Sequence, residues 1–596
     1  MKRHHKIILT TIVLIAVVLA YFFLRMAAFP GKIDTPEHKP VAVDTIHSTF
    51  REGEIYRHSN QPPMLEVSGT HYEMGLQYGV LLRPEILEAL EAYEDILRYI
   101  ASEERIPFPI LTALLKYRAG QMAGRLPERY REEIRGVSEG SGVREDVITA
   151  VSLMYDVFMT NGCTGLLMRT EYGGVIHGRS QEPYGFGYGG LLGKHTVVVR
   201  HKPQGYHAVT HMDVPLFMGV ETGYNDQGLA YSEETYSIRE SNSDGFPIVY
   251  LARLALETTV TLEGVNHTLD NYSVAAPGGM IWSDRNEKRG MRVELLPTAK
   301  AVQPFDESIL WDFNNIVDSV LVRQQHPRTS LAGFNRDREK IAAAFPEKPA
   351  YTVADAIAFL RSRHTADSCD YSRLGNHSSI ANAWGQQMVV FDPADNGFYL
   401  ALGKTFAALR DVYYYQDDFA KAPSHFLEAV PLDPVLEKVA RISTGLLYKE
   451  ERLQAYRSLT QKYPDDGQVH FLTAYESFDQ QRWDLFAHHA ERAYTLASGI
   501  RQYQLYAGLA AYHEGNLHQA KNLLKGIERQ PVPTCAGDLS PEQQLYRLTV
   551  LARADPDSAA QYDDEKQAIL EKYGAAAYYE KVMLPKQEEL EPTETP

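Results

Sequence analysis

The stretch that decides the fold begins with Asn161-Gly162-Cys163-Thr164 and ends with Gly173-Gly174-Val175-Ile176-His177-Gly178-Arg179-Ser180-Gln181-Glu182. Apolar residues lead into the Gly-Gly pair and out of it, and both glycines tolerate the positive φ of a two-residue hairpin turn. The pattern predicts two antiparallel strands that bring Arg179 and Glu182 back beside Cys163. Our hypothesis is that Cys163 becomes the first residue of a new chain by self-cleavage after Gly162.

A cysteine at an amino terminus can be catalytic without a histidine. Its own α-amino group, with an ordinary pKa of about 8, can take the thiol proton near neutral pH. A nearby guanidinium favours the thiolate, which is the role we expect for Arg179. Glu182 would accept a hydrogen bond from the α-ammonium group and hold it in place. The oxyanion that forms on the substrate needs a neutral donor such as an asparagine side chain.

Three other interpretations of the cysteines stay open at this point. Taken alone, a cysteine such as Cys163 is more often a small buried hydrophobic residue than a catalytic one. His177 shares the strand face of Arg179, so a Cys163–His177 dyad is an alternative. Cys369, with His364 and His377 nearby in sequence, is a further candidate nucleophile, although no flanking motif supports it.

Phosphate and metal sites have weaker support. Lys194 follows Gly193, but His195 stands where a phosphate-binding loop has Ser or Thr, and Tyr188 stands where it has Gly. His207 and His211 could share a helix face, but the local pattern indicates a strand. We therefore predict no cofactor and no metal.

Composition and charge limit the class of protein. The chain has 596 residues, of which 44% are hydrophobic and 23% charged, as in globular proteins of two or more domains. Its formal net charge of −17 argues against a surface that binds nucleic acid.

The amino-terminal segment predicts export. Ile7–Leu24 carries no charge and is long enough, at about 1.5 Å per residue, to cross a hydrocarbon layer about 30 Å thick. Lys2, Arg3 and Lys6 precede it, which predicts a cytoplasmic amino end and a catalytic domain on the periplasmic or extracytoplasmic side. The alternative is a cleaved signal peptide, with Met26-Ala27-Ala28 near the cut.

The cysteine content agrees with a catalytic thiol in an exported protein. The chain has 3 cysteines, too few for a disulfide framework. A free thiol in an oxidising compartment needs an explanation, and catalysis supplies one.

Strand and helix patterns alternate over most of the chain and predict an α+β layered domain. Expected strands include Met64–Gly69 and Leu216–Val220, and expected helices include Arg144–Met159, Pro247–Thr259 and Val353–Arg363. The predicted divisions are a cytoplasmic stub with transmembrane anchor or signal (1–25), a linker (26–54), the layered domain (55–420), a second linker (421–435), a helical domain (436–585) and a disordered acidic tail (586–596).

The helical domain has a repeat-like pattern. Gly508, Gly515 and Ala520 follow the small-residue spacing of a tetratricopeptide helix pair, and Ala487 and Ala493 mark a degenerate earlier copy. A plain helical bundle is the alternative. We expect this domain to dock a protein partner or to shield the site.

Several blocks together resemble a known family. They are Val67–Gly75 with Gly79, Glu132–Gly142, Asn161–Thr164, His177–Glu182, Gly223–Leu229 and Asp392-Pro393. In this order and spacing they resemble the acyl-coenzyme A:6-aminopenicillanate acyltransferase-like proteins, also grouped as C45 self-processing peptidases, which are N-terminal nucleophile (Ntn) hydrolases. The resemblance covers roughly residues 66–415. It implies a four-layer αββα sandwich and self-cleavage between Gly162 and Cys163.

The resemblance also implies site residues. Cys163 is the nucleophile and Arg179 falls at the position of the family's site arginine. Glu182 falls where the family usually has Asp, so the charge is kept on a longer arm. The oxyanion donor maps to Asn314, with Asn315 as the alternative. Two further substrate-binding residues are assigned, Glu234 from its likeness to a site glutamate and Thr164 beside the nucleophile.

The predicted function is that of a membrane-anchored amidohydrolase or acyltransferase. It would cleave or transfer the acyl group of a small-molecule or short-peptide amide through a thioester on Cys163. The rival interpretations are a catalytically degenerate scaffold that acts through the helical repeats, and a cysteine protease that uses a histidine.

Overall fold

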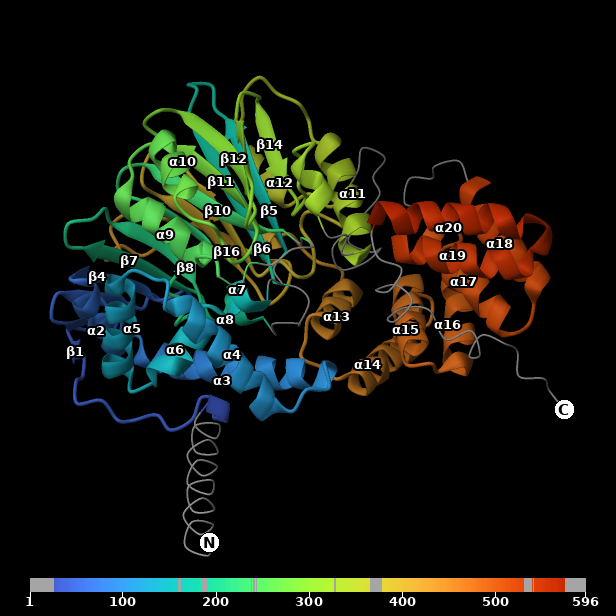
Figure 1. Ribbon diagram of the computed structural model, residues 1–596, viewed down its shortest axis with the longest axis horizontal. Coiled ribbons are helices and arrows are strands. Elements are labelled where there is room, and N and C mark those ends of the chain that lie inside the picture. Colours follow the sequence, from blue (N-terminus) through green and yellow to red (C-terminus); the bar gives the residue numbers. More distant parts are fainter. Residues whose placement is uncertain are drawn as a thin grey trace, which may run out of the picture.

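The computed structural model describes residues 26–158, 162–183, 190–236, 238, 242, 244–325, 329–364, 378–529, 539 and 541–573. Figure 1 shows two masses: a layered body of sheets and helices, and an array of helices formed by the carboxyl-terminal part. The candidate site belongs to the layered body.

The larger sheet has 11 strands in the described part of the chain. In spatial order they are β1 (Val41–Ala42), β2 (His47–Phe50), β3 (Gly53–Tyr56), β4 (Met64–Gly69), β7 (Val197–Pro203), β8 (Val209–Asp213), β9 (Thr222–Asn225), β10 (Leu229–Thr235), β11 (Gly278–Asp284), β12 (Arg289–Leu295) and β13 (Lys300–Pro304). The β4–β7 pair is parallel and the other pairs are antiparallel. The expected strand over Met64–Gly69 is confirmed.

The smaller sheet has 7 strands and contains Cys163. Its order is β14 (Ile309–Asp312), β5 (Gly162–Arg169), β6 (Val175–Glu182), β15 (Gln387–Phe391), β16 (Phe398–Leu402), β17 (Val412–Tyr415) and β18 (Ser424–Leu427). Buried side chains of both sheets meet between them, for example Met212 and Tyr224 with Phe391 and Phe398. The two sheets therefore pack face to face.

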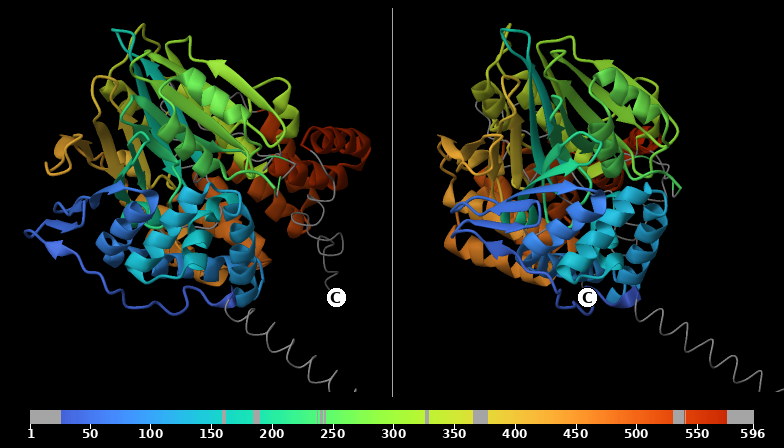
Figure 2. Two further views of the ribbon diagram at one scale, coloured as in Figure 1. Left: turned by 60° about the vertical axis from the view of Figure 1, so that its left-hand side comes forward. Right: turned by 90° about the vertical axis from the view of Figure 1, so that its left-hand side faces the viewer.

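Helices cover the outer face of each sheet. On the larger sheet they are α2 (His71–Leu81), α3 (Arg83–Glu103), α4 (Phe108–Ala123), α5 (Glu128–Ser141), α6 (Glu145–Ser152), α7 (Met154–Phe158), α9 (Ile248–Thr258) and α10 (Leu262–Asp270). On the smaller sheet they are α11 (Thr329–Ala343) and α12 (Val353–Leu360). A short helix, α8 (Leu191–His195), follows β6. The order helix, sheet, sheet, helix is the predicted layered arrangement (Figure 2).

Two blocks of the family resemblance form one close helix crossing. Gly75 and Gly79 of α2 face Gly136 and Gly140 of α5, and a Cβ atom at Gly75 would overlap the Glu133 backbone. Glycine lets the two helix backbones approach more closely than larger residues would allow. The α2 helix starts with a capping box between Thr70 and Glu73.

The carboxyl-terminal helices pack as consecutive neighbours. They are α13 (Pro434–Ser443), α14 (Lys449–Lys462), α15 (Gly467–Asp479), α16 (Trp483–Leu496), α17 (Arg501–His513), α18 (Leu517–Arg529), α19 (Pro541–Ala554) and α20 (Ala559–Tyr573). Gly508 of α17 lies against Leu524 of α18, where a Cβ atom would meet the leucine side chain. The all-helical character of this region is as predicted, and the tetratricopeptide assignment stays a prediction.

Four local predictions need correction. The predicted linker 26–54 contains β1 and β2 and the start of β3, because the backbone of this segment pairs in turn onto β4 at the edge of the larger sheet although its sequence lacks clear periodicity. Leu216–Val220 is a turn segment, in which Leu216 has a φ of 73°, and not a strand. The predicted helix 144–159 is divided into α6 and α7. The strand β18 extends the smaller sheet beyond residue 420 into the second predicted linker.

Two helix predictions agree closely with the structure. Pro247 precedes α9, and Thr352 caps α12 together with Asp355. Among the described residues, no helix is both long enough and apolar enough to span a membrane. The predicted anchor Ile7–Leu24 lies outside the described residues, as do Cys369, Cys535 and the tail 586–596.

The close approach of the two sheets at Gly165 gives a first prediction. A Cβ atom there would overlap Glu234 and Ile281 of the larger sheet. We expect Gly165→Ala to destabilise the domain by about 1–3 kcal/mol because neighbouring side chains must move. The matched change Gly120→Ala meets no atom within 4 Å and lies in an exposed part of α4, so it should stabilise slightly. Thermal unfolding compares the two, and an unchanged midpoint for Gly165→Ala would contradict the packing described.

Candidate active site around Cys163

The β5–β6 hairpin places the predicted residues in register. Cys163 pairs with Gln181, and Gly165 pairs with Arg179. The predicted two-residue turn is wider than expected: the amide of Thr170 donates to the Gly174 carbonyl at 2.8 Å, and Gly173 donates back to Thr170 at 3.0 Å. Gly173 alone of the glycine pair has a positive φ, 79°. The connection is therefore a three-residue loop that ends in a left-handed glycine.

Cys163 and Arg179 meet between the sheets. The Nη2 atom of Arg179 lies 2.9 Å from the Cys163 Sγ atom, and both side chains are buried. The same guanidinium donates to the Glu233 carbonyl at 2.6 Å and to Thr222 Oγ1, and lies 3.5 Å from Glu221. These hydrogen bonds fix the Arg179 guanidinium, so that its positive charge stays next to the Cys163 sulfur.

Burial and charge act in opposite directions on the thiol. Burial raises the pKa of Cys163 well above its ordinary value, whereas the Arg179 guanidinium lowers it. Glu234, Glu221 and Glu233 raise this pKa further. In the uncleaved chain the thiol is therefore held protonated.

Buried acidic residues lie close to Arg179. Burial, with Glu221 nearby, raises the pKa of Glu233 to about 8. Burial raises the pKa of Asp156 to about 7 and that of Asp213 well above its ordinary value. These carboxyl groups cannot all be ionised together, so the cluster holds protons near neutral pH.

Asn314 contacts the backbone of Cys163. Its Oδ1 atom accepts the Cys163 amide at 2.9 Å, and its Nδ2 atom donates to the Thr235 carbonyl at 3.1 Å. Asn314 has a φ of 68°, and its own amide donates to Asp312 Oδ1 at 2.8 Å. Asn315 points elsewhere, to Glu339 and Asn335. Of the two candidates, Asn314 is the one beside Cys163.

The structure contradicts the expected position of Glu182. Side chains alternate between faces along a strand, so Arg179 and Glu182, three positions apart, cannot face the same layer. Glu182 lies on the opposite face of the sheet, where it accepts from Thr164 Oγ1 at 2.9 Å and pairs with Arg338 at 3.0 Å. The Cys163 amide donates to Asn314 instead of Glu182. Burial raises the pKa of Glu182, and Arg338 opposes the shift.

Arg338 of α11 is a site residue that sequence reasoning missed. Its Nη1 atom donates to the Cys163 carbonyl at 3.0 Å and to Glu182, and its Nη2 atom donates to the Phe313 carbonyl at 3.1 Å and lies 3.4 Å from Asn314 Oδ1. It therefore ties together the start of β5, the end of β6 and the turn that carries Asn314. The only sequence signal is an arginine in an amphipathic helix, which most often indicates an exposed side chain.

The two other predicted binding residues lie on different faces. Glu234 is buried between the sheets, against Gly165, and accepts from Ser232 Oγ at 3.2 Å. Burial raises its pKa well above the ordinary value. Thr164 faces the helix layer with Glu182 and Arg338.

His177 does not pair with Cys163; its ring contacts two serines instead. Its ring nitrogens lie 3.1 Å from Ser283 Oγ and 2.9 Å from Ser232 Oγ. Burial lowers the pKa of His177 to about 3, so the ring is neutral. His211 is one of the two histidines considered above as metal ligands. Its Nε2 atom lies 3.2 Å from the Nε2 atom of His201.

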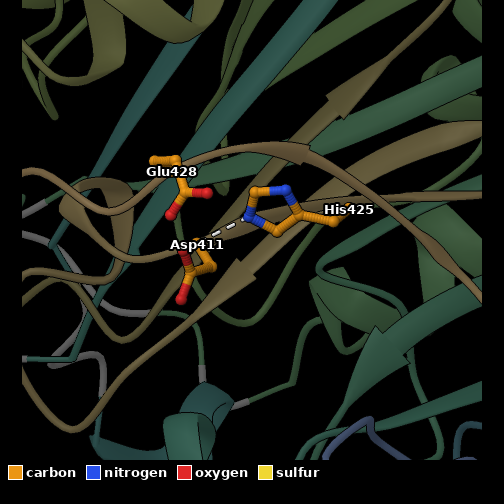
Figure 3. Close-up of side chains that lie close together, drawn as sticks. All are labelled: Asp411, His425 and Glu428. Atoms are coloured by element: carbon orange, nitrogen blue, oxygen red, sulfur yellow. Dashed lines mark hydrogen bonds and ion pairs between the residues drawn. The ribbon is translucent and has the colours of Figure 1, made fainter.

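A separate cluster has the residue types that bind metal ions. Asp411, His425 and Glu428 lie at the β17–β18 end of the smaller sheet, with their ligand atoms within 4.8 Å of one another (Figure 3). His425 and Glu428 are exposed, and Asp411 Oδ1 also accepts the Ala429 amide at 2.9 Å. None of these three residues contacts the Cys163 site, so they are not assigned a role in it.

Comparison with known proteins matches the layered domain. Residues 191–405 match the family described as "Acyl-coenzyme A:6-aminopenicillanic acid acyl-transferase". Mouse acid ceramidase is 22% identical over 210 residues, covering 31% of this chain and 52% of that protein. The chain thus spans about half the length of this curated relative.

The chain is also similar to solved structures of an amidase and an acylase. Solved structures of similar type include a Caenorhabditis elegans N-acylethanolamine-hydrolyzing acid amidase ortholog, with 16% identity, a TM-score of 0.28 and coverage of 39% of this chain and 93% of that one. Penicillin V acylase from Agrobacterium tumefaciens has 15% identity, a TM-score of 0.29 and coverage of 43% and 86%. The segment that matches the acyltransferase family begins after β6, so Cys163 and Arg179 lie outside it.

The buried Arg338–Glu182 pair gives a second prediction. We expect Arg338→Met to destabilise the domain by about 3–5 kcal/mol, because it leaves a buried carboxylate without its partner. Adding Glu182→Gln should recover part of this loss. The matched change Arg336→Met, at a half-buried position of the same helix, should cost much less. Denaturant unfolding of the wild type and these three variants tests the pairing, and equal losses for Arg338→Met and Arg336→Met would contradict it.

Proposed function

We propose that this protein is a self-processing amidohydrolase whose nucleophile is the amino-terminal thiol of Cys163. The observation that carries the proposal is the position of Arg179 Nη2, 2.9 Å from the Cys163 sulfur. Asn314 at the Cys163 amide and the family match of residues 191–405 support it. Known relatives are described as a ceramidase, an amidase and acylases, all of which suit an acyl amide substrate.

Self-cleavage uses the thiol against its own chain. The sulfur attacks the Gly162 carbonyl carbon, the bond from that carbon to the Cys163 nitrogen breaks, and the thiol proton ends on that nitrogen. Water then hydrolyses the Gly162 thioester, which leaves a Gly162 carboxylate, a free thiol and a free α-amino group. Arg338, 3.0 Å from the Cys163 carbonyl, fixes the strand while these bonds change.

Turnover then uses the new α-amino group. It takes the thiol proton, and the sulfur attacks the acyl carbonyl of the substrate while Arg179 balances the negative charge. Asn314 Nδ2 serves as the neutral donor to the oxyanion. The α-ammonium group protonates the leaving amine, and water releases the acid and regenerates the thiol. Glu182 acts through Arg338 as a positioning residue.

Location decides between hydrolysis and acyl transfer. We assign Ile7–Leu24 as a membrane anchor because this run carries no charge and follows Lys2, Arg3 and Lys6. The same charge pattern assigns the layered domain to the exterior. Coenzyme A thioesters are not expected there, so water is the proposed acceptor. The helical domain would dock a protein partner or shield the site.

Self-cleavage is tested by intact-mass analysis with amino-terminal sequencing. The purified wild-type chain should yield a fragment that begins at Cys163, and Cys163→Ala should remain one chain. The matched variants Cys369→Ala and Cys535→Ala should cleave like the wild type. A wild-type chain that stays uncleaved and still hydrolyses acyl amides would contradict the mechanism.

The role of the oxyanion donor gives a fourth prediction. Asn314→Gly removes the side chain but keeps a residue that tolerates the positive φ at this position. We expect kcat for acyl amide hydrolysis to fall by about 10²–10³, the loss typical of one oxyanion donor. Asn315→Gly serves as the control and should lose far less. Similar losses for both variants would remove Asn314 from its assigned role.

A further inference from the structure

The outward face of α4 differs from the rest of this acidic protein. Ile110, Leu114 and Tyr117 are 42%, 52% and 56% exposed. Their spacing places them on one side of the helix, three or four residues apart. Large apolar side chains gathered on one exposed helix face mark a surface that contacts something other than water.

The α4 segment itself contains basic residues but no acidic ones. Between Pro107 and Gly124, none of the exposed positions carries a charged side chain. The stretch from Ile106 to Pro127 contains no Asp or Glu, although the chain as a whole has a net charge of −17. Arg118 and Arg125 are half-buried beside the face, and Arg125 pairs with the exposed Asp244 at 2.5 Å. An apolar stripe with basic residues and no acidic residue in its own segment is the composition of helices that lie on anionic lipid surfaces.

The first described residues are bound to the inner side of this same helix. Thr112 donates to the Ala27 carbonyl at 2.7 Å, and Lys116 donates to the Ala28 carbonyl. Phe29 is buried in the core that α4 helps to form. The views in Figures 1 and 2 place the start of the described chain at the same end of the molecule as α3 and α4.

We propose that the exposed face of α4, formed by Ile110, Leu114 and Tyr117, rests in the interface of the lipid bilayer. The uncharged run Ile7–Leu24 ends just before Met26, so any membrane that holds this run comes close to α4. The contact orients the layered domain by two attachments, the amino-terminal run and α4. It does not depend on the proposed catalytic activity.

Tryptophan probes in the full-length chain test the contact. Tyr117→Trp replaces one aromatic residue by another on the α4 face, and Tyr172→Trp does so in the β5–β6 turn, where Tyr172 is 82% exposed. Both chains are reconstituted in vesicles of phosphatidylcholine and phosphatidylglycerol, with or without brominated acyl chains. We expect emission from position 117 to shift to shorter wavelength and to be quenched by bromolipid, while emission from position 172 changes little.

Further variants exclude other occupants of the face. Adding Leu114→Glu to Tyr117→Trp should weaken the quenching, whereas adding Val302→Glu, at a position 39% exposed on β13, should not. If Tyr117→Trp fails to fold, Leu114→Trp takes its place. The proposal is overturned if the full chain does not float with vesicles, if position 117 is quenched no more than position 172, or if cross-linking shows that α4 contacts a second copy instead.

Discussion

Two buried guanidinium groups bracket Cys163 on opposite faces of one strand. Arg179 reaches the sulfur from the space between the sheets, and Arg338 holds the carbonyl from the helix layer. Burying each guanidinium group costs free energy, and contacts with carboxyl groups and backbone carbonyls offset this cost. Because both contacts fix the start of β5, the thiol, the Gly162–Cys163 peptide bond and Asn314 have one arrangement. The chemistry that we propose depends on that arrangement.

The strand register also separates two tasks. Residues that face the other sheet, Arg179 and Glu234, set the charge around the sulfur, and their burial links the protonation of the thiol to that of the acidic cluster. Residues that face α11, Thr164 and Glu182, hold Arg338 in place. A carboxylate on the second face can thus matter for the site without approaching the reacting atoms.

Sequence reasoning predicted what depends on local patterns. The hairpin, the nearness of Arg179 to Cys163 and the layered arrangement follow from strand periodicity and a glycine turn. Proximity along the hairpin predicts Glu182 beside Cys163, but side chains alternate between the faces of a strand, and Glu182 lies on the opposite face. Arg338 comes from a distant helix whose pattern does not indicate which of its arginines is buried. The strands within 26–54 form by pairing with a sheet edge, a long-range contact that leaves little trace in the sequence.

The central claim is that the acyl group passes through a thioester on an amino-terminal cysteine. Acid quenching during hydrolysis of an acyl amide, followed by peptide mass mapping, tests it most directly. The account predicts the acyl mass on a peptide that begins at Cys163, carries a free α-amino group and loses the acyl group to hydroxylamine. An acyl group found on another residue, or on Cys163 still joined to Gly162, would contradict it.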